Sequence, residues 1–458
     1  MKTGIKTFLC VLINVGLSAA AFGADPGLTS GSCAAGAEDI VAAIEPPRIP
    51  DQQFNIVDFG ALSGGSEDAR PAILNTIKHA ATQGGGKVIL PPGLWLSNGP
   101  IVLQSNIELH IADGARLLFS PNPADYLPAV LNRWEGTEVY SHSPLIYARD
   151  VHDVAITGKG IIDGNQDSEF FGWHPREKPD QLALRKMGFS DVPVAQRQFG
   201  EGHLLRPSLI QFFSAERVLL TDYTARNSPF WVNHLVFTEH AIIRGVRVDS
   251  HHANNDGVDV DSSRYVLVEH NHFRTGDDAV VVKSGRDLDG RKRARPSEYV
   301  VIRHNDMGGE DGVALGSEMS GDIRHVYFTD NILRTGSAAI RFKSNLDRGG
   351  VVEQIRVCNM QVESFQHLFW FQLNYPGELG GNFPPLYRDI LFENIGVEKA
   401  STALEVHAPE GFPLQNVTFR NIDIKHADTT FVLENAENLV FENLKINGER
   451  IDGRLDWR

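Results

Sequence analysis

Cysteine is scarce in this chain, which excludes several kinds of fold and site. The 458 residues contain three cysteines, and one of them, Cys10, lies in the N-terminal apolar stretch. Only Cys33 and Cys358 remain, too few for a scaffold built on disulfides or for a zinc site with paired cysteines. One disulfide between these two would fit an oxidising compartment, and two separate buried thiols fit the sequence equally well.

Positive charge is also in short supply. Lys and Arg number 43 against 58 Asp and Glu, which gives a formal net charge of −15 at pH 7. This balance argues against general affinity for nucleic acid. The balance does not exclude an anionic substrate, because a local basic groove can exist on an acidic protein. With 42% hydrophobic and 22% charged residues, the composition is that of a soluble globular protein.

Long apolar runs are absent, and the one short run lies at the N-terminus. Lys2 and Lys6 precede the run 8–21, and Ala21-Phe22-Gly23 follows as a small-x-small cleavage site. These features predict a signal peptide over residues 1–23 and export to the periplasm or the medium. The run is too short to span a bilayer, so we expect no membrane insertion after cleavage. Residues 24–50, rich in Gly, Ala, Ser and Pro, are expected to form a flexible leader.

From about residue 100 onward the chain repeats a β-rich run, an asparagine and a second β-rich run. The repeated asparagines are Asn271, Asn305, Asn331, Asn359, Asn394, Asn421 and Asn443. A variable period of about 20–35 residues without helical periodicity is typical of a parallel β-helix. Each asparagine is expected to adopt a left-handed bend and to bond its amide to the asparagines above and below.

The predicted fold is therefore all-β, with one parallel β-helix domain over residues 51–458. Residues 68–82 form the clearest helix, with Ala72, Ile73 and Ile77 on one apolar stripe. We expect this helix to cap the first coil, because an open solenoid end exposes edge strands. Residues 163–207 do not repeat, and a loop of that length is expected to form a wall of the binding cleft.

Four repeats carry charged residues at matching positions. The repeats are NNDGVDVDS (254–262), GDDAVVVKS (276–284), GEDGVALGS (309–317) and SAAIRFKS (337–344). Aligned on their last serine, they place Asp256, Asp278 and Asp311 in one column. The preceding column holds Asn255, Asp277 and Glu310, and the column before the serine holds Lys283 and Lys343. Equal positions of successive coils stack about 4.8 Å apart, so these side chains should form one mixed-charge patch.

Paired acids beside Arg and Lys indicate cleavage of a bond in an anionic sugar polymer. Glycoside hydrolysis needs one carboxylic acid to protonate the leaving oxygen and a second carboxylate to activate water or to attack. Repulsion among Asp256, Asp277 and Asp278 should keep at least one of them protonated near neutral pH. Arg341 and Lys343 share a strand face, where the Arg fork and the Lys point charge can hold a substrate carboxylate.

Five further residues are candidate substrate contacts: Asn254, Glu310, Arg286, Trp231 and Tyr375. Arg286 begins a basic run that could equally be a solvated loop. The two aromatic rings could stack on sugars, and core packing is the alternative for both. Carboxylate clusters also hold Ca²⁺ in polysaccharide lyases. The Arg and Lys of this patch supply positive charge that a bound metal ion would otherwise supply, so we predict no metal and no cofactor.

At these motifs the chain resembles the pectin-degrading polygalacturonases, glycoside hydrolase family 28. The resemblance rests on FNIVDFGA (54–61), GGGKVILPPG (84–93), SPLIYA (143–148), ITGKGIIDG (156–164), NSPFWVNH (227–234) and GSEMSG (316–321). RWEGTEVY (133–140) and SNLDRGG (344–350) are most similar to the bacterial, often exo-acting branch.

The resemblance implies a right-handed β-helix and an inverting mechanism without a metal. It implies Asp277 as the general acid and Asp256 with Asp278 as the pair that positions and activates water. It also implies that Arg341 and Lys343 hold the galacturonate carboxylate. Stacking alone puts Asp256 and Asp278 about 5 Å apart, which is nearer to the spacing of retaining enzymes.

One departure from the family concerns a histidine. The family usually has Gly-His-Gly where this chain has Gly309-Glu310-Asp311, so we assign the histidine column to Glu310. A carboxylate there should raise the pKa of neighbouring acids. The pH optimum could move, the substrate could differ from plain polygalacturonate, or activity could be largely lost.

The leading hypothesis is an exported, monomeric hydrolase that removes galacturonic acid from the non-reducing end of pectic chains. A hydrolase of rhamnogalacturonan or another decorated uronide would keep the mechanism and change the substrate. A uronide-binding β-helix without activity is a third hypothesis, although binding alone does not need the three acids. A lyase would require Ca²⁺ and would release unsaturated products.

Overall fold

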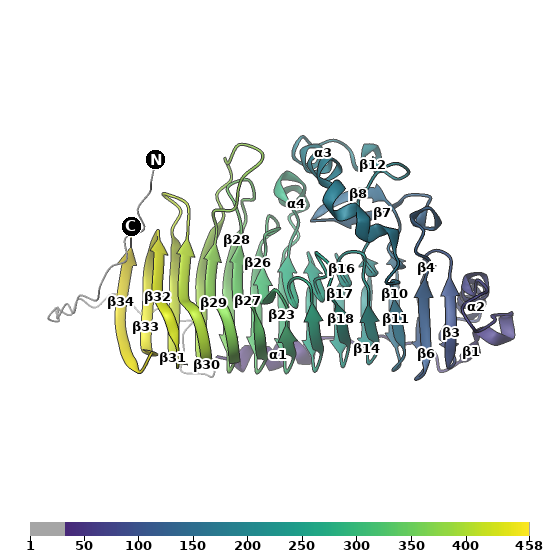
Figure 1. The fold of residues 1–458 in the computed structure, drawn as a ribbon, viewed down its shortest axis with the longest axis horizontal. Coiled ribbons are helices and arrows are strands. Elements are labelled where there is room, and N and C mark those ends of the chain that lie inside the picture. The colour runs from purple at the N-terminus through teal and green to yellow at the C-terminus, as the bar shows by residue number, and fades with distance from the viewer. Residues whose placement is uncertain (1–32, 458) are drawn as a thin grey trace. The chain divides into compact units, whose positions relative to one another are not determined.

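The computed structural model describes residues 33–457, and its fold is a right-handed parallel β-helix (Figure 1). Strand side chains point alternately inward and outward, and the inward positions are apolar. Val258 and Val260, for example, are 0% exposed. The prediction of an all-β parallel β-helix is confirmed. The predicted signal peptide lies outside the described residues.

Three parallel ladders of strands run along the solenoid. The first ladder contains β4 (Ile101–Val102), β9 (Ile146–Arg149), β13 (Ile210–Phe213), β16 (Asn233–Val236), β19 (Val258–Asp261), β22 (Val280–Lys283), β25 (Asp311–Leu315), β27 (Ile332–Lys343), β29 (Gln361–Gln372), β30 (Leu386–His407) and β32 (Ala427–Glu434). The long strands β27 and β29 also take part in one of the other two ladders, and β30 takes part in both of them.

The other two ladders form the rest of each coil. One contains β1 (Gln53–Asn55), β2 (Gly86–Leu90), β5 (Ile107–Ile111), β10 (His152–Thr157), β14 (Glu216–Thr221), β17 (Glu239–Arg244), β20 (Arg264–Glu269), β23 (Ser297–Arg303), β26 (Ile323–Thr329), β28 (Val351–Cys358), β30, β31 (Leu414–Ile424) and β33 (Ala436–Ile446). The other contains β3 (Gly93–Ser97), β6 (Ala115–Phe119), β11 (Ile161–Asp163), β15 (Thr224–Arg226), β18 (Arg247–Ser250), β21 (His272–Thr275), β24 (Asp306–Gly308), β27 and β29.

Both ends of the solenoid are covered. Helix α2 (Arg70–Thr82) packs its buried face, which includes Ile73 and Ile77, beside β1 and β2, as predicted for residues 68–82. At the other end, β34 (Glu449–Trp457) adds antiparallel to β33. These elements cover the edges that unpaired strands would otherwise expose.

The asparagine column differs in part from the prediction. The amides of Asn271, Asn305 and Asn331 are buried and bonded in series, with Nδ2 to Oδ1 distances of 2.9 Å. In these coils the left-handed bend belongs to the preceding residue, such as His270 at φ 56°. From Asn359 onward the asparagine itself makes the bend, at φ 55°. The hydrogen-bond ladder was therefore predicted correctly, but the position of the bend was not.

The expectation of a flexible leader is wrong for residues 33–50. Cys33 forms a disulfide with Cys358 of β28. Helix α1 (Ala35–Ala43) follows, and its Ala37 and Ile40 pack against Leu267 of β20 and Val301 of β23. Composition suggested a mobile segment because it does not reveal the apolar surface on which this helix packs.

The non-repeating segments lie over the first ladder (Figure 1). The insertion contains η3 (Glu169–Arg176), α3 (Lys178–Phe189), η4 (Val194–Gln196) and β12 (Gln198–Phe199), and α4 (Asp287–Arg293) packs beside α3. Strand β12 joins a hairpin made of β7 (Val130–Trp134) and β8 (Thr137–Ser141). Two short helices, η1 (Ile56–Phe59) and η2 (Pro123–Tyr126), complete the structure. Among the described helices, none has the length and apolar character that a membrane crossing requires.

Candidate active site

The register of the first ladder brings the predicted columns together. Val258 pairs with Val280, Val280 with Val313, and Val313 with Ile340. Two residues earlier in each coil lie Asp256, Asp278, Asp311 and Ala338. Asp277 precedes Asp278 in the bend between β21 and β22, and not in a strand. The bend is what allows two adjacent acids to reach one site.

Asp256, Asp277 and Asp278 form one acid cluster. Each offers a carboxylate oxygen within 4.8 Å of those of the other two. Asp277 is half-buried, whereas Asp256 and Asp278 are buried at 2% and 0% exposure. The Asp278 N–H donates to Asp277 Oδ1 at 3.0 Å, and Asn254 Nδ2 lies 3.4 Å from Asp277 Oδ2. Asp277 is thus the acid of the cluster that faces outward.

Two lysines neutralise the buried acids. Lys343 Nζ lies 2.8 and 2.7 Å from the two carboxylate oxygens of Asp278. Lys283 Nζ lies 3.7 Å from Asp256 Oδ2 and 3.9 Å from Asp259 Oδ1. A metal ion bound to all three acids of the cluster would have to displace Lys343 from Asp278.

The neighbouring acids differ in protonation. Burial, followed by the charge of Asp278, raises the pKa of Asp277 to about 6. Burial would also raise the pKa of Asp278, but Lys343 and Lys283 outweigh it and hold that pKa below its usual value. Burial and the charges of Asp259 and Asp277 raise the pKa of Asp256 well above its usual value. The site can therefore hold a protonated Asp277 beside an ionised Asp278.

Arg341 is held by partners on the coil before and the coil after its own. Its NH1 donates to Asp311 Oδ2 at 2.8 Å, and its NH2 donates to Gln372 Oε1 at 2.7 Å and to the Tyr375 hydroxyl at 2.8 Å. The guanidinium also lies 4.1 Å from the centre of the Trp370 ring. Arg341 Nε has no hydrogen-bond partner among the described residues. Tyr375 is therefore next to the predicted site residue Arg341.

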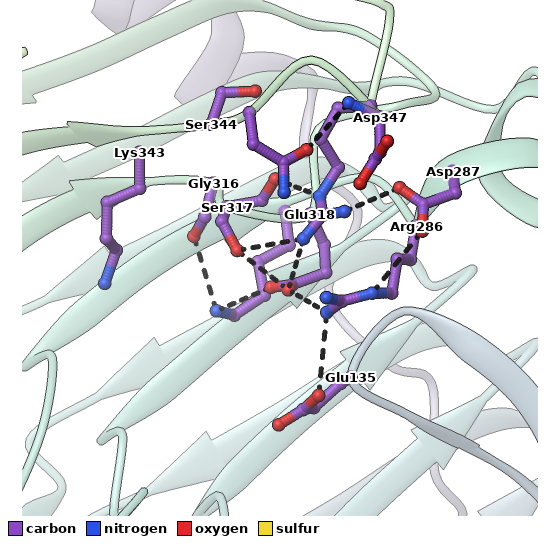
Figure 2. A network of polar contacts seen from close by, with 12 residues as sticks. Glu135, Arg286, Asp287, Gly316, Ser317, Glu318, Lys343, Ser344 and Asp347 are labelled. Carbon is purple, nitrogen blue, oxygen red and sulfur yellow. Dashed lines mark hydrogen bonds and ion pairs between the residues drawn. The ribbon is translucent and has the colours of Figure 1, made fainter. Parts of the chain in front are cut away.

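Arg286 and Trp231 are buried rather than open to a ligand. Arg286 is 5% exposed, and its NH1 donates to Glu318 at 2.9 Å and lies 3.5 Å from Glu135. Figure 2 shows Glu318 at the centre of this network, which also includes Asp287 and Ser317. Trp231 is 3% exposed, stacks on Phe230 and lies under Lys283, whose Nζ is 4.7 Å from the ring centre. Neither side chain offers a free face to a sugar.

Glu310 lies at the rim of the cluster. Its side chain is exposed, and its backbone N–H donates to the Asp277 carbonyl at 3.2 Å. Burial and the charges of Asp311 and Asp278 raise the pKa of Glu310. Glu310 in turn is one of the charges that raise the pKa of Asp277.

Sequence reasoning left several site residues out of the candidate set. Asp311 shares a column with Asp256 and Asp278, and that signal was sufficient to include it. Lys283 was also visible as the column partner of Lys343. Trp370 and Gln372 follow from the register, because they pair with Arg341 and Lys343. Glu318 lies in the GSEMSG motif (316–321), but it was not singled out as a candidate.

Comparison with known proteins identifies the family. The family model described as "Glycosyl hydrolases family 28" matches residues 131–443. A probable polygalacturonase of Vitis vinifera is 27% identical over 386 residues, covering 80% of this chain and 73% of that protein. An exo-poly-alpha-D-galacturonosidase of Dickeya chrysanthemi is 25% identical over 442 residues, covering 86% of this chain and 71% of that protein.

A solved structure agrees with these matches. The exopolygalacturonase of Thermotoga maritima superposes with a TM-score of 0.88 at 36% identity, covering 92% of this chain and 99% of that one. Together with the family match over most of the chain, this likeness shows that the chain belongs to family 28 of the glycosyl hydrolases.

Proposed function

We propose that this hydrolase removes galacturonic acid from one end of pectic chains, with Asp277 as general acid and Asp278 as general base. The observation that carries this proposal is the pair of adjacent acids with opposite pKa shifts. Asp277 is the more accessible, so it can donate its proton to the oxygen that leaves. Asp278 can accept a proton from water while Lys343 stabilises its charge.

In this proposal Asp256 helps Asp278 to hold the water molecule that attacks the sugar. It is buried beside Asp277 and Asp278, and the pKa of Asp256 is raised by burial and by its acidic neighbours. A protonated carboxyl can donate a hydrogen bond to water and accept another. Asp256 therefore helps to position the water, while the base is Asp278.

Inversion of the anomeric carbon is supported by the burial of Asp278. The cluster oxygens lie within 4.8 Å of one another, which is closer than the roughly 6.5–9.5 Å of typical inverting pairs. A retaining mechanism, however, would need Asp278 or Asp256 to attack the sugar directly. Asp278 is 0% exposed and both its oxygens contact Lys343, so water is the more accessible nucleophile.

Recognition of the uronate carboxylate is assigned to Arg341, with Tyr375 beside it, while Asn254 lies beside Asp277. Arg341 and Tyr375 are both half-buried, so each has some surface that a substrate can contact. Lys343 is 7% exposed and mainly neutralises Asp278.

Action at a chain end is supported by a difference between the two ends of the first ladder: its N-terminal coils are covered, and its C-terminal coils are more exposed. One column of outward residues runs through Gln211, His234, Asp259, Val281, Ala314, Arg341, Trp370 and Glu405. The first five are buried, and the last three are half-buried. The β7–β8 hairpin covers the N-terminal part, where the Gln211 amide donates to the Arg133 carbonyl at 3.1 Å. A polymer can thus extend from the acids only toward the C-terminal coils.

Export is supported by the disulfide. Cys33 and Cys358 are bonded in the structure, and such bonds persist mainly in oxidising compartments. This agrees with the predicted signal peptide and with a periplasmic or extracellular location. We propose that the protein acts there as a monomer.

A second candidate substrate is favoured by one observation. Glu310 places a carboxylate beside Asp277, at the rim of the site. A second negative charge there disfavours a uronate bound next to it, so rhamnogalacturonan or another decorated uronide is the alternative. A binding protein without activity would not need opposite pKa shifts at Asp277 and Asp278.

Product analysis tests the proposal. The mature protein is incubated with polygalacturonate and with rhamnogalacturonan oligosaccharides, with and without chelator, and NMR identifies the anomer released first. Saturated galacturonic acid with inverted configuration, released despite chelator, is the expected result. Unsaturated products that need Ca²⁺ would show a lyase. Asp277→Asn should abolish turnover without changing the fold, because the side chains are nearly equal in shape, and full activity in that variant would contradict the assignment of the acid.

A further inference from the structure

Asp311 contacts both cations of the proposed site. It begins β25, is 0% exposed and accepts the Ala338 N–H at Oδ1 over 3.1 Å. Its Oδ2 lies 2.8 Å from Arg341 NH1 and 3.6 Å from Lys343 Nζ. These contacts connect the residue assigned to the substrate with the residue that neutralises the base.

Asp311 also stacks directly on Asp278. The register of β22 and β25 aligns the two residues, and the Ala279 N–H donates to the Asp311 carbonyl at 2.9 Å. Two ionised carboxylates so close in a buried site repel each other strongly. Lys343 contacts both oxygens of Asp278 at hydrogen-bond distance but lies 3.6 Å from Asp311. The ammonium thus stabilises a charge on Asp278 in preference to one on Asp311.

We propose that Asp311 is a positioning residue that works in its protonated form: its carboxyl donates a hydrogen bond to ionised Asp278 and anchors Arg341. This inference rests on the proposed function, in which Asp278 is the base. Asp311 touches no substrate in this proposal. It acts by keeping Lys343 on Asp278 and the Arg341 guanidinium in place.

The charged groups around Asp311 are consistent with this state. Lys343 and Arg341 lie on β27, Asp278 lies one coil before, and Glu310 precedes Asp311 in the chain. Burial raises the pKa of Asp311 to about 6, and the charge and a hydrogen bond of Asp278 add to the rise. The charges of Lys343 and Arg341 oppose it. Above that pH, Asp311 ionises, and Lys343 is shared between two anions while Asp278 loses its hydrogen-bond donor.

The pH dependence of Asp311→Asn tests the inference. Asn keeps an oxygen for Arg341 and an N–H donor for Asp278 but cannot ionise; it loses the second oxygen, which accepts the Ala338 N–H, and that loss should not depend on pH. Two groups, Asp277 and Asp311, must be protonated in the wild type, and only Asp277 in the variant. The ratio of kcat/KM in the variant to that in the wild type should therefore rise about tenfold between pH 5 and pH 7. Asp423→Asn, which removes an exposed carboxylate of β31, is the matched control and should leave the ratio constant.

A purely structural role for Asp311 would lower the rate equally at every pH, and a constant ratio would overturn the inference. If Asp311→Asn fails to fold, infrared titration of a protein with Asp256→Asn, Asp259→Asn, Asp277→Asn and Glu310→Gln replaces it, because these other acids of raised pKa would add bands of their own. A protonated-carboxyl band should disappear as pH rises through about 6 in that variant. No such loss between pH 5 and pH 7 would also overturn the inference. This titration needs no substrate, so it can succeed even if product analysis rejects the proposed function.

Discussion

The Lys343 ammonium contacts both carboxylate oxygens of Asp278, at 2.8 and 2.7 Å. Both side chains are buried, so the pair is largely shielded from water. A cation bound in this way stabilises the ionised form of Asp278 and leaves the adjacent Asp277 without an equal partner. The pair therefore gives a physical reason why two neighbouring aspartates differ in protonation, and each prediction about the rate depends on it.

Activity should fall as pH rises above about 6. The general acid must be protonated, and burial with the charge of Asp278 raises the pKa of Asp277 to about 6. The base must be ionised, and the pKa of Asp278 is below its usual value, so the acidic limb should lie below about pH 4. The initial rate on galacturonate oligosaccharides between pH 3 and pH 8 measures both limbs. A flat profile between pH 5 and pH 8 would contradict the assignment of Asp277.

Lys343→Met should impair both the reaction and the fold. Without the ammonium, burial should raise the pKa of Asp278, so the acidic limb of the rate profile should move upward. Removing one partner of a buried ion pair costs about 3–5 kcal/mol of stability. Urea unfolding and the pH profile of kcat/KM measure the two effects. Lys425→Met is the control, because Lys425 pairs with Glu398 where both side chains are more than half exposed. An unshifted acidic limb in a folded Lys343→Met protein would refute this explanation of the Asp278 pKa.

Removal of the disulfide should destabilise the folded protein. The bond joins Cys33 to Cys358 across 325 residues of sequence and fixes the segment that contains α1. Loss of such a bond typically costs about 2–4 kcal/mol. The Tm of Cys33→Ala should therefore lie below that of the oxidised wild type, and reductant should lower only the wild-type Tm. Cys358→Ala should behave in the same way. A wild-type Tm that reductant does not change would argue against a stabilising role for the bond.

Much of the fold could be predicted because it repeats. Each coil has apolar residues at the same inward positions, and equal positions must stack at the strand spacing. Alignment of the repeats on Ser262, Ser284 and Ser317 is therefore enough to place Asp256, Asp278 and Asp311 together. The same alignment predicts that Arg341 and Lys343 approach these acids.

The contacts of non-repeating segments could not be predicted in this way. Trp231 and Arg286 were candidate substrate contacts, with core packing and a solvated loop as the alternatives, and the structure shows both covered by neighbours from other segments. Trp231 packs with Trp134 of the hairpin, and Arg286 pairs with Glu135. Such contacts join residues more than 90 positions apart without any period, so no local pattern reveals them. The packing of α1 on β20 and β23 was missed for the same reason.

The last prediction concerns the closed end of the site. Arg185 of α3 joins two segments: its NH2 lies 2.7 Å from Glu135, and its NH1 lies 2.6 Å from Glu378. Glu378 belongs to a loop that Asp347 orders by accepting the backbone N–H groups of Glu378, Leu379 and Gly381. The same loop carries Tyr375, which contacts Arg341. The Arg185–Glu378 pair thus links the insertion to the part of the site that holds the substrate.

Glu378→Ala should loosen this link and change the products. If the link helps to close one end of the site, the variant should release galacturonate dimers and trimers from polygalacturonate in addition to monomer. Stability should change little, because Arg185 keeps its pair with Glu135 in the variant and is not left as an unpaired charge. Chromatography of early products measures the effect, and Glu398→Ala, which breaks a more exposed pair, is the control. Monomer as the sole product of both Glu378→Ala and Arg185→Ala would mean that the insertion closes the site without this pair, through the packing of its buried side chains.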